Sequence, residues 1–233
     1  PENRMRAPLR LLLVLCMLAC SPQVGGQHAV ILSPAVVAPS QWEPEFAQFE
    51  AQDRASPPRA GSIVFVGSSS IRMWTTLDSD FPGVPVLNRG FGGSEAGDAA
   101  QFAERIVVPY KPRVVVFYAG DNDLNAGKSP AQVLAAFQSF VATMHRDLPA
   151  TRVVFVSIKP SIARWSIVDK MREANALVRD YTRTDPLLAY VDVFTPMLDA
   201  SGQPRRELYI EDGLHMTPAG YAIWRDLIAP VIR

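Results

Sequence analysis

Three consecutive serines, Ser68–Ser70, follow an apolar run that begins at Ile63 and ends at Gly67. A β-branched and aromatic run that ends in glycine and small hydroxyl residues predicts a buried parallel strand with the serines at its carboxyl end. Open α/β sheets bind their ligands at that edge. A serine hydroxyl there can act as a nucleophile once a base takes its proton. Ser69 is the leading candidate, and Ser70 is the runner-up.

The base that such a serine needs is a histidine first of all, because its pKa lies near neutral pH. His28 falls in a Pro- and Ser-rich stretch, and His145 falls on the solvated face of a predicted helix. His215 falls on a predicted loop just before a helix start at Pro218. Asp212, three residues before His215, can accept the ring N–H and fix the tautomer, as the acid of a triad does.

Hydrolysis of an acyl group also needs donors for the oxyanion. Two loops after predicted strands offer them, Asn88–Gly93 with its glycines and Ala119–Leu124 with its polar side chains. A glycine lets backbone N–H groups approach a ligand, and Asn122 can donate through its side chain. Ordinary turn chemistry is the alternative interpretation of both loops.

The elements that must position these residues alternate along the chain. Short β-branched runs predict five strands, and the apolar periodicity predicts four longer helices. The predicted strands are 63–66, 85–88, 114–118, 153–157 and 189–193, and the predicted helices are 42–55, 131–148, 168–182 and 218–232. Alternating strands and helices predict a three-layer α/β/α sandwich around a parallel sheet of about five strands.

The composition is that of one globular domain. The chain has 233 residues, of which 48% are hydrophobic and 20% charged, and its formal net charge is zero. The lack of a basic excess argues against a nucleic-acid partner. Both cysteines, Cys16 and Cys20, lie in the N-terminal apolar segment, so the body of the protein has neither a disulfide nor a cysteine metal site.

The N-terminal segment is typical of an export signal. Arg6 and Arg10 lead into the apolar run Leu11–Cys20, which is too short to span a bilayer comfortably. The run ends in a sequence similar to a bacterial lipobox, which would make Cys20 the lipidated residue and a membrane anchor. Cleavage around Val24–Gln27 and free release is the alternative.

The chain is therefore divided into three parts. Residues 1–27 are predicted to be a signal or lipoprotein signal segment, residues 28–41 a tether, and residues 42–233 a catalytic-type domain with an N-terminal helix. The expected location is periplasmic, envelope-anchored or extracellular, as in bacteria. The oligomeric state is left open.

The ordered motifs resemble those of the SGNH hydrolases, also called GDSL esterases and lipases. Four blocks match across nearly all of residues 62–224. The matching blocks are Gly67-Ser68-Ser69 with Trp74, Asn88–Gly93, Gly120–Asp123 and Asp212–His215. Ser68 stands where the family commonly has aspartate, which is not a triad member. The resemblance implies a flavodoxin-like SGNH hydrolase fold.

The resemblance also implies a set of site residues. Ser69 would be the nucleophile, with His215 as base and Asp212 as acid. The backbone N–H groups of Ser69 and Gly93 and the side chain of Asn122 would form the oxyanion hole. Neither a metal nor an organic cofactor is required.

The expected reaction is hydrolysis of a carboxylic ester through an acyl-enzyme. The substrate would be a small-molecule ester or an acylated glycan, with a short-chain or O-acetyl ester favoured. The alternatives are a non-catalytic module that binds an acylated sugar or lipid, and a doubly wound nucleotide-binding protein. Gly127-Lys128-Ser129 is not a phosphate-binding loop, because Asn122 stands where that motif needs glycine. Arg72, Arg89 and Lys159 are interpreted as structural or solvated charges.

Overall fold

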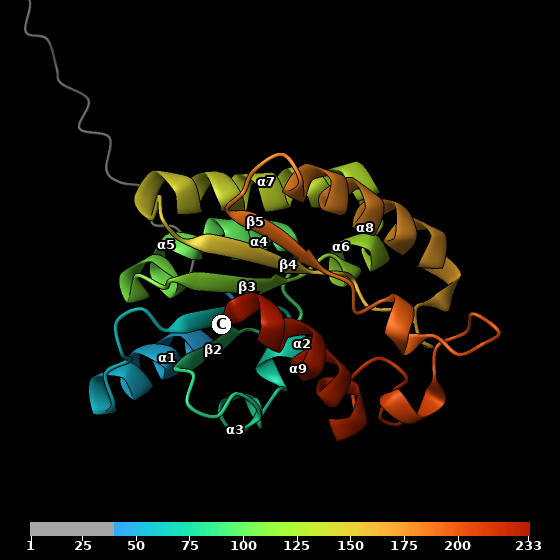
Figure 1. The fold of residues 1–233 in the computed structure, drawn as a ribbon, viewed down its shortest axis with the longest axis horizontal. Coiled ribbons are helices and arrows are strands. Elements are labelled where there is room, and N and C mark those ends of the chain that lie inside the picture. Colours follow the sequence, from blue (N-terminus) through green and yellow to red (C-terminus); the bar gives the residue numbers. More distant parts are fainter. Residues whose placement is uncertain (1–39) are drawn as a thin grey trace, which may run out of the picture. The chain divides into compact units, whose positions relative to one another are not determined.

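A single parallel sheet forms the centre of the computed structural model, which describes residues 40–233 (Figure 1). Its five strands have the order β2-β1-β3-β4-β5. The strands are β1 (Ile63–Gly67), β2 (Val86–Gly90), β3 (Val114–Tyr118), β4 (Arg152–Val156) and β5 (Leu188–Val191). The predicted signal segment 1–27 and nearly all of the predicted tether lie outside the described residues.

Helices cover both faces of this sheet (Figure 1). One face carries α4 (Ala96–Gln101), α5 (Ala103–Ile106), α6 (Asp121–Asn125), α7 (Pro130–Asp147) and α8 (Val168–Thr182). The other carries α2 (Ser69–Arg72), α3 (Leu77–Asp80) and α9 (Pro218–Ile232). Single 3₁₀ turns complete the connections: η1 (Val108–Tyr110), η2 (Trp165–Ile167), η3 (Thr195–Met197) and η4 (Arg206–Leu208). Within residues 40–233, every helix is too short or too polar to cross a membrane.

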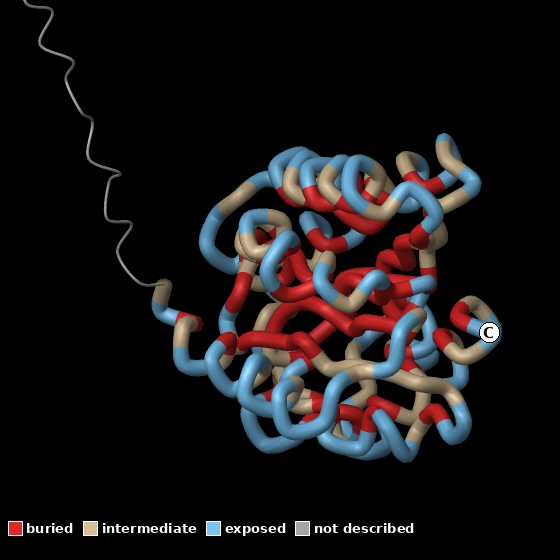
Figure 2. Tube along the Cα trace, turned by 90° about the vertical axis from the view of Figure 1, so that its left-hand side faces the viewer, coloured by how far each residue is buried: buried red, intermediate tan, exposed pale blue. Residues whose placement is uncertain are grey.

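The alternation of side chains along the strands explains why there are two cores. Val64 and Val66 of β1 pack into one cluster, and Ile63 and Phe65 pack into the other. All five residues of β1 are buried, as expected for a strand covered on both faces. Figure 2 shows the buried band running between layers of exposed helix. The predicted three-layer fold is confirmed.

The N-terminal helix α1 (Glu43–Ala55) packs beside the edge strand β2 and is held there by ion pairs and by aromatic contacts. Arg105 binds Glu43 through two hydrogen bonds of 2.8 and 2.7 Å and also binds Glu50. Arg89 of β2 is 2% exposed and pairs with Asp53 of α1. Phe46 of α1 is 1% exposed and packs against Phe91 and Phe102, so the helix is held by aromatic packing as well as by these ion pairs.

One boundary differs from the prediction in a way that bears on the site. Arg89 and Gly90 were expected in a loop after the predicted strand 85–88, but they belong to β2. Arg89 tolerates burial because Tyr110 and Asp53 both bind its guanidinium, so it can stand in the sheet without an unpaired charge. The other strands lie within two residues of their predicted positions.

Candidate active site

Two glycines shape the turn that carries the serines. Gly67 ends β1 with φ +139, and a Cβ atom there would lie 1.7 Å from the carbonyl oxygen of Tyr118. Gly90 ends β2, and a Cβ atom there would lie 2.2 Å from the backbone nitrogen of Arg72. The ends of β1 and β3 therefore meet without side chains between them, and α2 sits directly on the end of β2. This packing fixes Ser69, the first residue of α2, at the carboxyl edge of the sheet.

Ser69 is distinguished from its two neighbours by exposure and by its partner. Ser68 is 1% exposed and Ser70 2% exposed, whereas Ser69 is partly open to solvent. The Ser69 Oγ lies 2.9 Å from His215 Nε2. Ser70 is fixed in the core, where its carbonyl accepts a hydrogen bond of 3.0 Å from the Tyr221 hydroxyl. The structure thus brings the histidine to Ser69 and not to Ser70.

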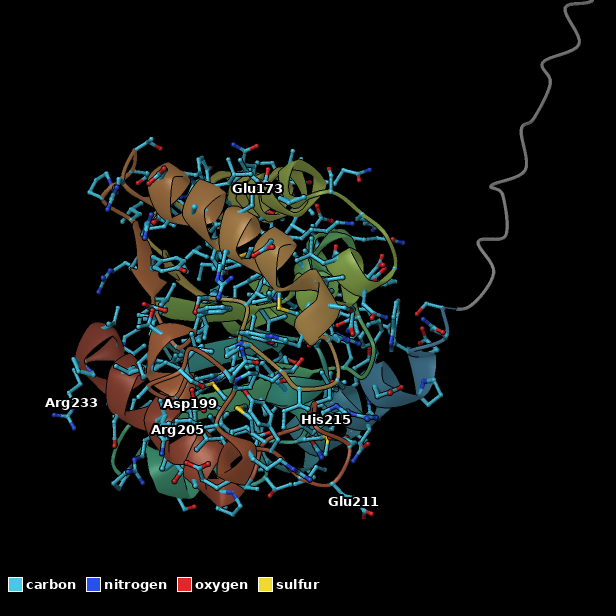
Figure 3. All side chains as sticks on the ribbon, turned by 90° about the vertical axis from the view of Figure 1, so that its right-hand side faces the viewer. Glu173, Asp199, Arg205, Glu211, His215 and Arg233 are labelled. Atoms are coloured by element: carbon cyan, nitrogen blue, oxygen red, sulfur yellow. The ribbon has the colours of Figure 1, made fainter. Side chains whose placement is uncertain are left out.

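His215 lies on the loop before α9, inward of Glu211, which projects from the surface (Figure 3). Its Nδ1 is 2.5 Å from Asp212 Oδ2. The other carboxylate oxygen of Asp212 accepts the backbone N–H groups of Leu214 at 2.8 Å and His215 at 2.9 Å. Burial by itself raises the pKa of Asp212, but these hydrogen bonds outweigh it and lower the pKa to about 2. Asp212 is therefore an ionised acceptor that orients the imidazole at neutral pH.

The two predicted donor loops meet beside Ser69's strand end. Asn122 donates its side-chain Nδ2 to the carbonyl of Ser94 at 2.8 Å, which joins the loop after β3 to the loop after β2. Gly93 is exposed and has φ +73, and a Cβ atom there would meet nothing within 4 Å. Glycine is therefore needed at this position for its backbone conformation, not for space.

A buried cluster of charges that sequence reasoning missed lies behind Asn122. Arg164 donates from Nη2 to Asn122 Oδ1 at 2.8 Å, and its Nη1 lies 3.0 Å from Asp121 Oδ2. Lys159 Nζ lies 3.5 Å from the same carboxylate oxygen. Burial lowers the pKa of Lys159, and the charge of Asp121 opposes that shift. Lys159 is 1% exposed, so it is a structural charge and not a solvated one.

The remaining polar candidates have ordinary structural surroundings. His145 Nδ1 lies 3.6 Å from Asp185 Oδ2, on α7 and away from Ser69. Ser129, the last residue of the rejected phosphate-loop motif, caps α7 by accepting the N–H of Gln132 at 3.2 Å. No group of three or more His, Cys, Asp or Glu side chains within residues 40–233 is placed to hold a metal ion.

Comparison with known proteins decides the family. The model of the GDSL-like lipase/acylhydrolase family matches residues 62–223. The chain belongs to this family. The resemblance seen in the four sequence blocks is confirmed, and this GDSL-like acylhydrolase is a carboxylic-ester hydrolase. Helix α1 lies outside the residues that the family model matches.

Solved structures share the fold of this acylhydrolase. A candidate acylhydrolase from Bacteroides fragilis is 25% identical, with a TM-score of 0.67 and coverage of 79% of this chain and 94% of that one. A GDSL-like lipase from Bacteroides thetaiotaomicron is 20% identical, with a TM-score of 0.68 and coverage of 80% and 96%. A catalytic mutant of an acetylxylan esterase from Geobacillus stearothermophilus is 14% identical, with a TM-score of 0.59 and coverage of 75% and 95%. A search of curated protein sequences found no match.

Proposed function

We propose that this acylhydrolase cleaves its ester through a covalent acyl-enzyme on Ser69. One observation carries the proposal: a continuous line of hydrogen bonds runs from Asp212 to His215 and on to Ser69, with distances of 2.5 and 2.9 Å. His215 takes the Ser69 proton as the Oγ attacks the ester carbonyl, and Asp212 stabilises the imidazolium that forms. Because the carboxylate is ionised, the ring presents the Nε2 lone pair to the serine.

The oxyanion of the tetrahedral intermediate is held by the backbone N–H groups of Ser69 and Gly93 and by Asn122 Nδ2. Ser69 is the first residue of α2, and a helix does not use the N–H of its first residue. Arg164 occupies Oδ1 of Asn122, and Ser94 accepts one of the two Nδ2 protons. The second proton of that amide is then available to the developing negative charge.

The reaction completes in two steps. Collapse of the first tetrahedral intermediate expels the alcohol, which receives the proton held by His215. The acyl group remains on the Ser69 Oγ. Water then attacks the acyl carbon and gives its proton to His215. The carboxylic acid leaves as the proton returns to the serine. Only residues of this chain and water take part in these steps.

The substrate class that we propose is a short-chain or O-acetyl ester, carried by a small molecule or by an acylated glycan. Support comes from the predicted export of the chain and from the acetylxylan esterase among its structural neighbours. We also propose that the protein works outside the cytoplasm, either released or anchored through Cys20. The family match favours an enzyme over both alternatives, the binding module and the nucleotide-binding protein.

The test is hydrolysis of p-nitrophenyl esters of increasing chain length by wild type, Ser69→Ala and a matched control, Ser79→Ala. Ser79 is an exposed serine on α3. We expect kcat to fall by about 10⁴-fold or more in Ser69→Ala and to remain unchanged in Ser79→Ala. Acetate should be the preferred acyl group. Wild-type turnover by a folded Ser69→Ala protein would refute the assignment, and a preference for long acyl chains would refute the substrate class.

A further inference from the structure

The peptide that joins Gly92 to Gly93 is the central peptide of a turn. Gly92 and Gly93 are its two middle residues, and the φ of Gly93 is +73, the value of the third residue of a type II turn. Rotation of this peptide by half a turn would give the type I form, in which the third residue has a negative φ. Glycine on both sides offers little steric resistance to such a rotation. The Gly93 N–H that we assign to the oxyanion hole would then point away from the site.

A side chain outside the family match holds this peptide in one orientation. The indole Nε1 of Trp42 donates a hydrogen bond of 2.7 Å to the carbonyl oxygen of Gly92. In a planar trans peptide the C=O and the following N–H point in opposite directions. The bond from Trp42 to Gly92 therefore also sets the direction of the Gly93 N–H, and it draws electron density toward the carbonyl, which strengthens that N–H as a donor.

Trp42 is itself fixed by aromatic packing. It is 8% exposed. Its ring packs edge-on against Phe91, with ring centroids 5.2 Å apart, and against Phe102, with ring centroids 6.0 Å apart. It stands at the start of α1, which the Arg105–Glu43 ion pair ties to α5. The donor thus belongs to a packed element rather than to a free loop, and rotation of the peptide would leave a buried indole N–H without its partner.

We propose that Trp42 is a positioning residue for the oxyanion hole: its indole N–H locks the Gly92–Gly93 peptide so that the Gly93 N–H faces the reacting carbonyl. This inference rests on the proposed function, because it takes Gly93 as an oxyanion donor. It gives α1, which lies outside the matched family domain, a role in the rate of the chemical step.

The experiment compares Trp42→Phe with Phe102→Leu. Both substitutions remove apolar contacts from the same aromatic cluster, but only Trp42→Phe also removes the hydrogen bond to Gly92. We expect Trp42→Phe to lower kcat on p-nitrophenyl acetate by about 10- to 100-fold, with KM within about twofold of wild type. Phe102→Leu should lower the melting temperature but keep kcat within about twofold of the wild-type value.

A transition-state mimic distinguishes a misdirected Gly93 N–H from a general loosening of the site. A trifluoromethyl ketone forms a tetrahedral adduct with the serine that carries an oxyanion, so its affinity should fall in Trp42→Phe by the same factor as kcat. The affinity of the corresponding ketone substrate analogue that forms no adduct should not change. An unchanged kcat in folded Trp42→Phe, or an equal loss of kcat in Phe102→Leu, would overturn the proposal.

A second pair of variants keeps the inference testable if Trp42→Phe does not fold. Gly93→Asn and Gly93→Ala both add a Cβ where there is open space, but asparagine tolerates a positive φ better than alanine does. Gly93→Asn should therefore keep a higher kcat, and a higher kcat in Gly93→Ala would contradict the locked turn. Wild-type kcat in Ser69→Ala would refute the proposed function as a whole. Loss of kcat in Ser69→Ala together with wild-type kcat in Trp42→Phe would refute this inference alone.

Discussion

The proposed nucleophile, Ser69, and the proposed base, His215, are held in the site by different means. Ser69 stands between two buried serines, on a turn fixed by backbone contacts of β1 with β3 and of β2 with α2. His215 and Asp212 stand on an exposed loop, where the Asp212 side chain is 43% exposed. The hydrogen bonds of Asp212 lie within this loop, and one bond of 3.1 Å, from the Ala163 N–H to the Gly213 carbonyl, joins it to the segment after β4. The position of the serine therefore depends on the ends of three strands, whereas the position of the histidine depends mainly on its own loop and on one contact to the segment after β4.

Because of this difference, substitutions near Ser69 and substitutions in the His215 loop should affect stability and activity to different extents. A change beneath Ser69 must disturb the strand ends on which the fold depends, so it should affect the free energy of unfolding. A change in the loop at Asp212–His215 removes side chains that carry little of the core, so it should affect the reaction with little effect on the fold. The predictions below test this division.

The largest effect is expected from His215→Ala. Loss of the base should lower kcat by about 10⁴- to 10⁶-fold, as in other enzymes whose triad acts as a unit. Because the side chain lies at the surface end of the site, the melting temperature should change by only a few degrees. The matched control is His145→Ala on α7, for which turnover of p-nitrophenyl acetate should remain at the wild-type level. Equal turnover by His215→Ala and His145→Ala would contradict the role proposed for His215.

Gly67→Ala should have the opposite profile. The added Cβ would fall 1.7 Å from the Tyr118 carbonyl oxygen, so β1 and β3 would have to separate. We expect a loss of about 3 kcal/mol or more in the free energy of unfolding, measured by chemical denaturation. Gly97→Ala is the control, because a Cβ there meets nothing within 4 Å. A Gly67→Ala protein as stable as Gly97→Ala would show that the ends of β1 and β3 can move apart at little cost, and would contradict this prediction.

Arg164→Met tests whether the buried charges behind Asn122 act on the reaction. Without the donor to Oδ1, the amide of Asn122 is held only by its bond to the Ser94 carbonyl, so its free N–H is aimed less firmly at the oxyanion. We expect kcat to fall by about tenfold with little change in KM, and Arg164→Lys to recover part of the loss. Arg172→Met, at an exposed arginine on α8, should have no effect on kcat. Equal kcat values for Arg164→Met and Arg172→Met would show that the buried charges beside Asn122 have a structural role only.

The smallest effect concerns stability in acid. The pKa of Asp212 is about 2 in the folded chain, below its ordinary value of 3.8. Its ionised form therefore stabilises the folded chain above about pH 4, and this contribution is lost as the pH falls toward 2. The melting temperature of wild type should exceed that of Asp212→Asn by a small amount at pH 5, and the gap should close by about pH 2. A gap that stays constant over this range would argue against the hydrogen-bonded carboxylate.

The sequence predicted the elements and residues that depend on local pattern. The apolar runs located all five strands, and the periodicity located α8 and α9 at their observed bounds. The spacing of Asp212 and His215 was enough to predict that the two side chains lie together, because the contact is made within one turn of chain. Ser69 was assigned by its position after a strand and by the family blocks, and the structure brings His215 to it across the sequence.

What depends on distant contacts could not be predicted. Helices α2, α3 and α5 have only four residues, too few to show a period of 3.6. Arg89 was assigned to a loop because nothing in its local sequence shows that Asp53 neutralises it. Arg164 and Trp42 were missed for the same reason: each reaches a loop far along the chain, and only the folded structure shows the partner.

The most direct test of the catalytic line from Asp212 to Ser69 is covalent labelling with a fluorophosphonate ester, followed by peptide mass spectrometry. Such a probe phosphonylates a serine only where a base activates it, and the adduct is stable. We predict a single adduct on Ser69 in wild type, and no adduct in Ser69→Ala or His215→Ala. An adduct on Ser70, or labelling that persists in His215→Ala, would contradict the account.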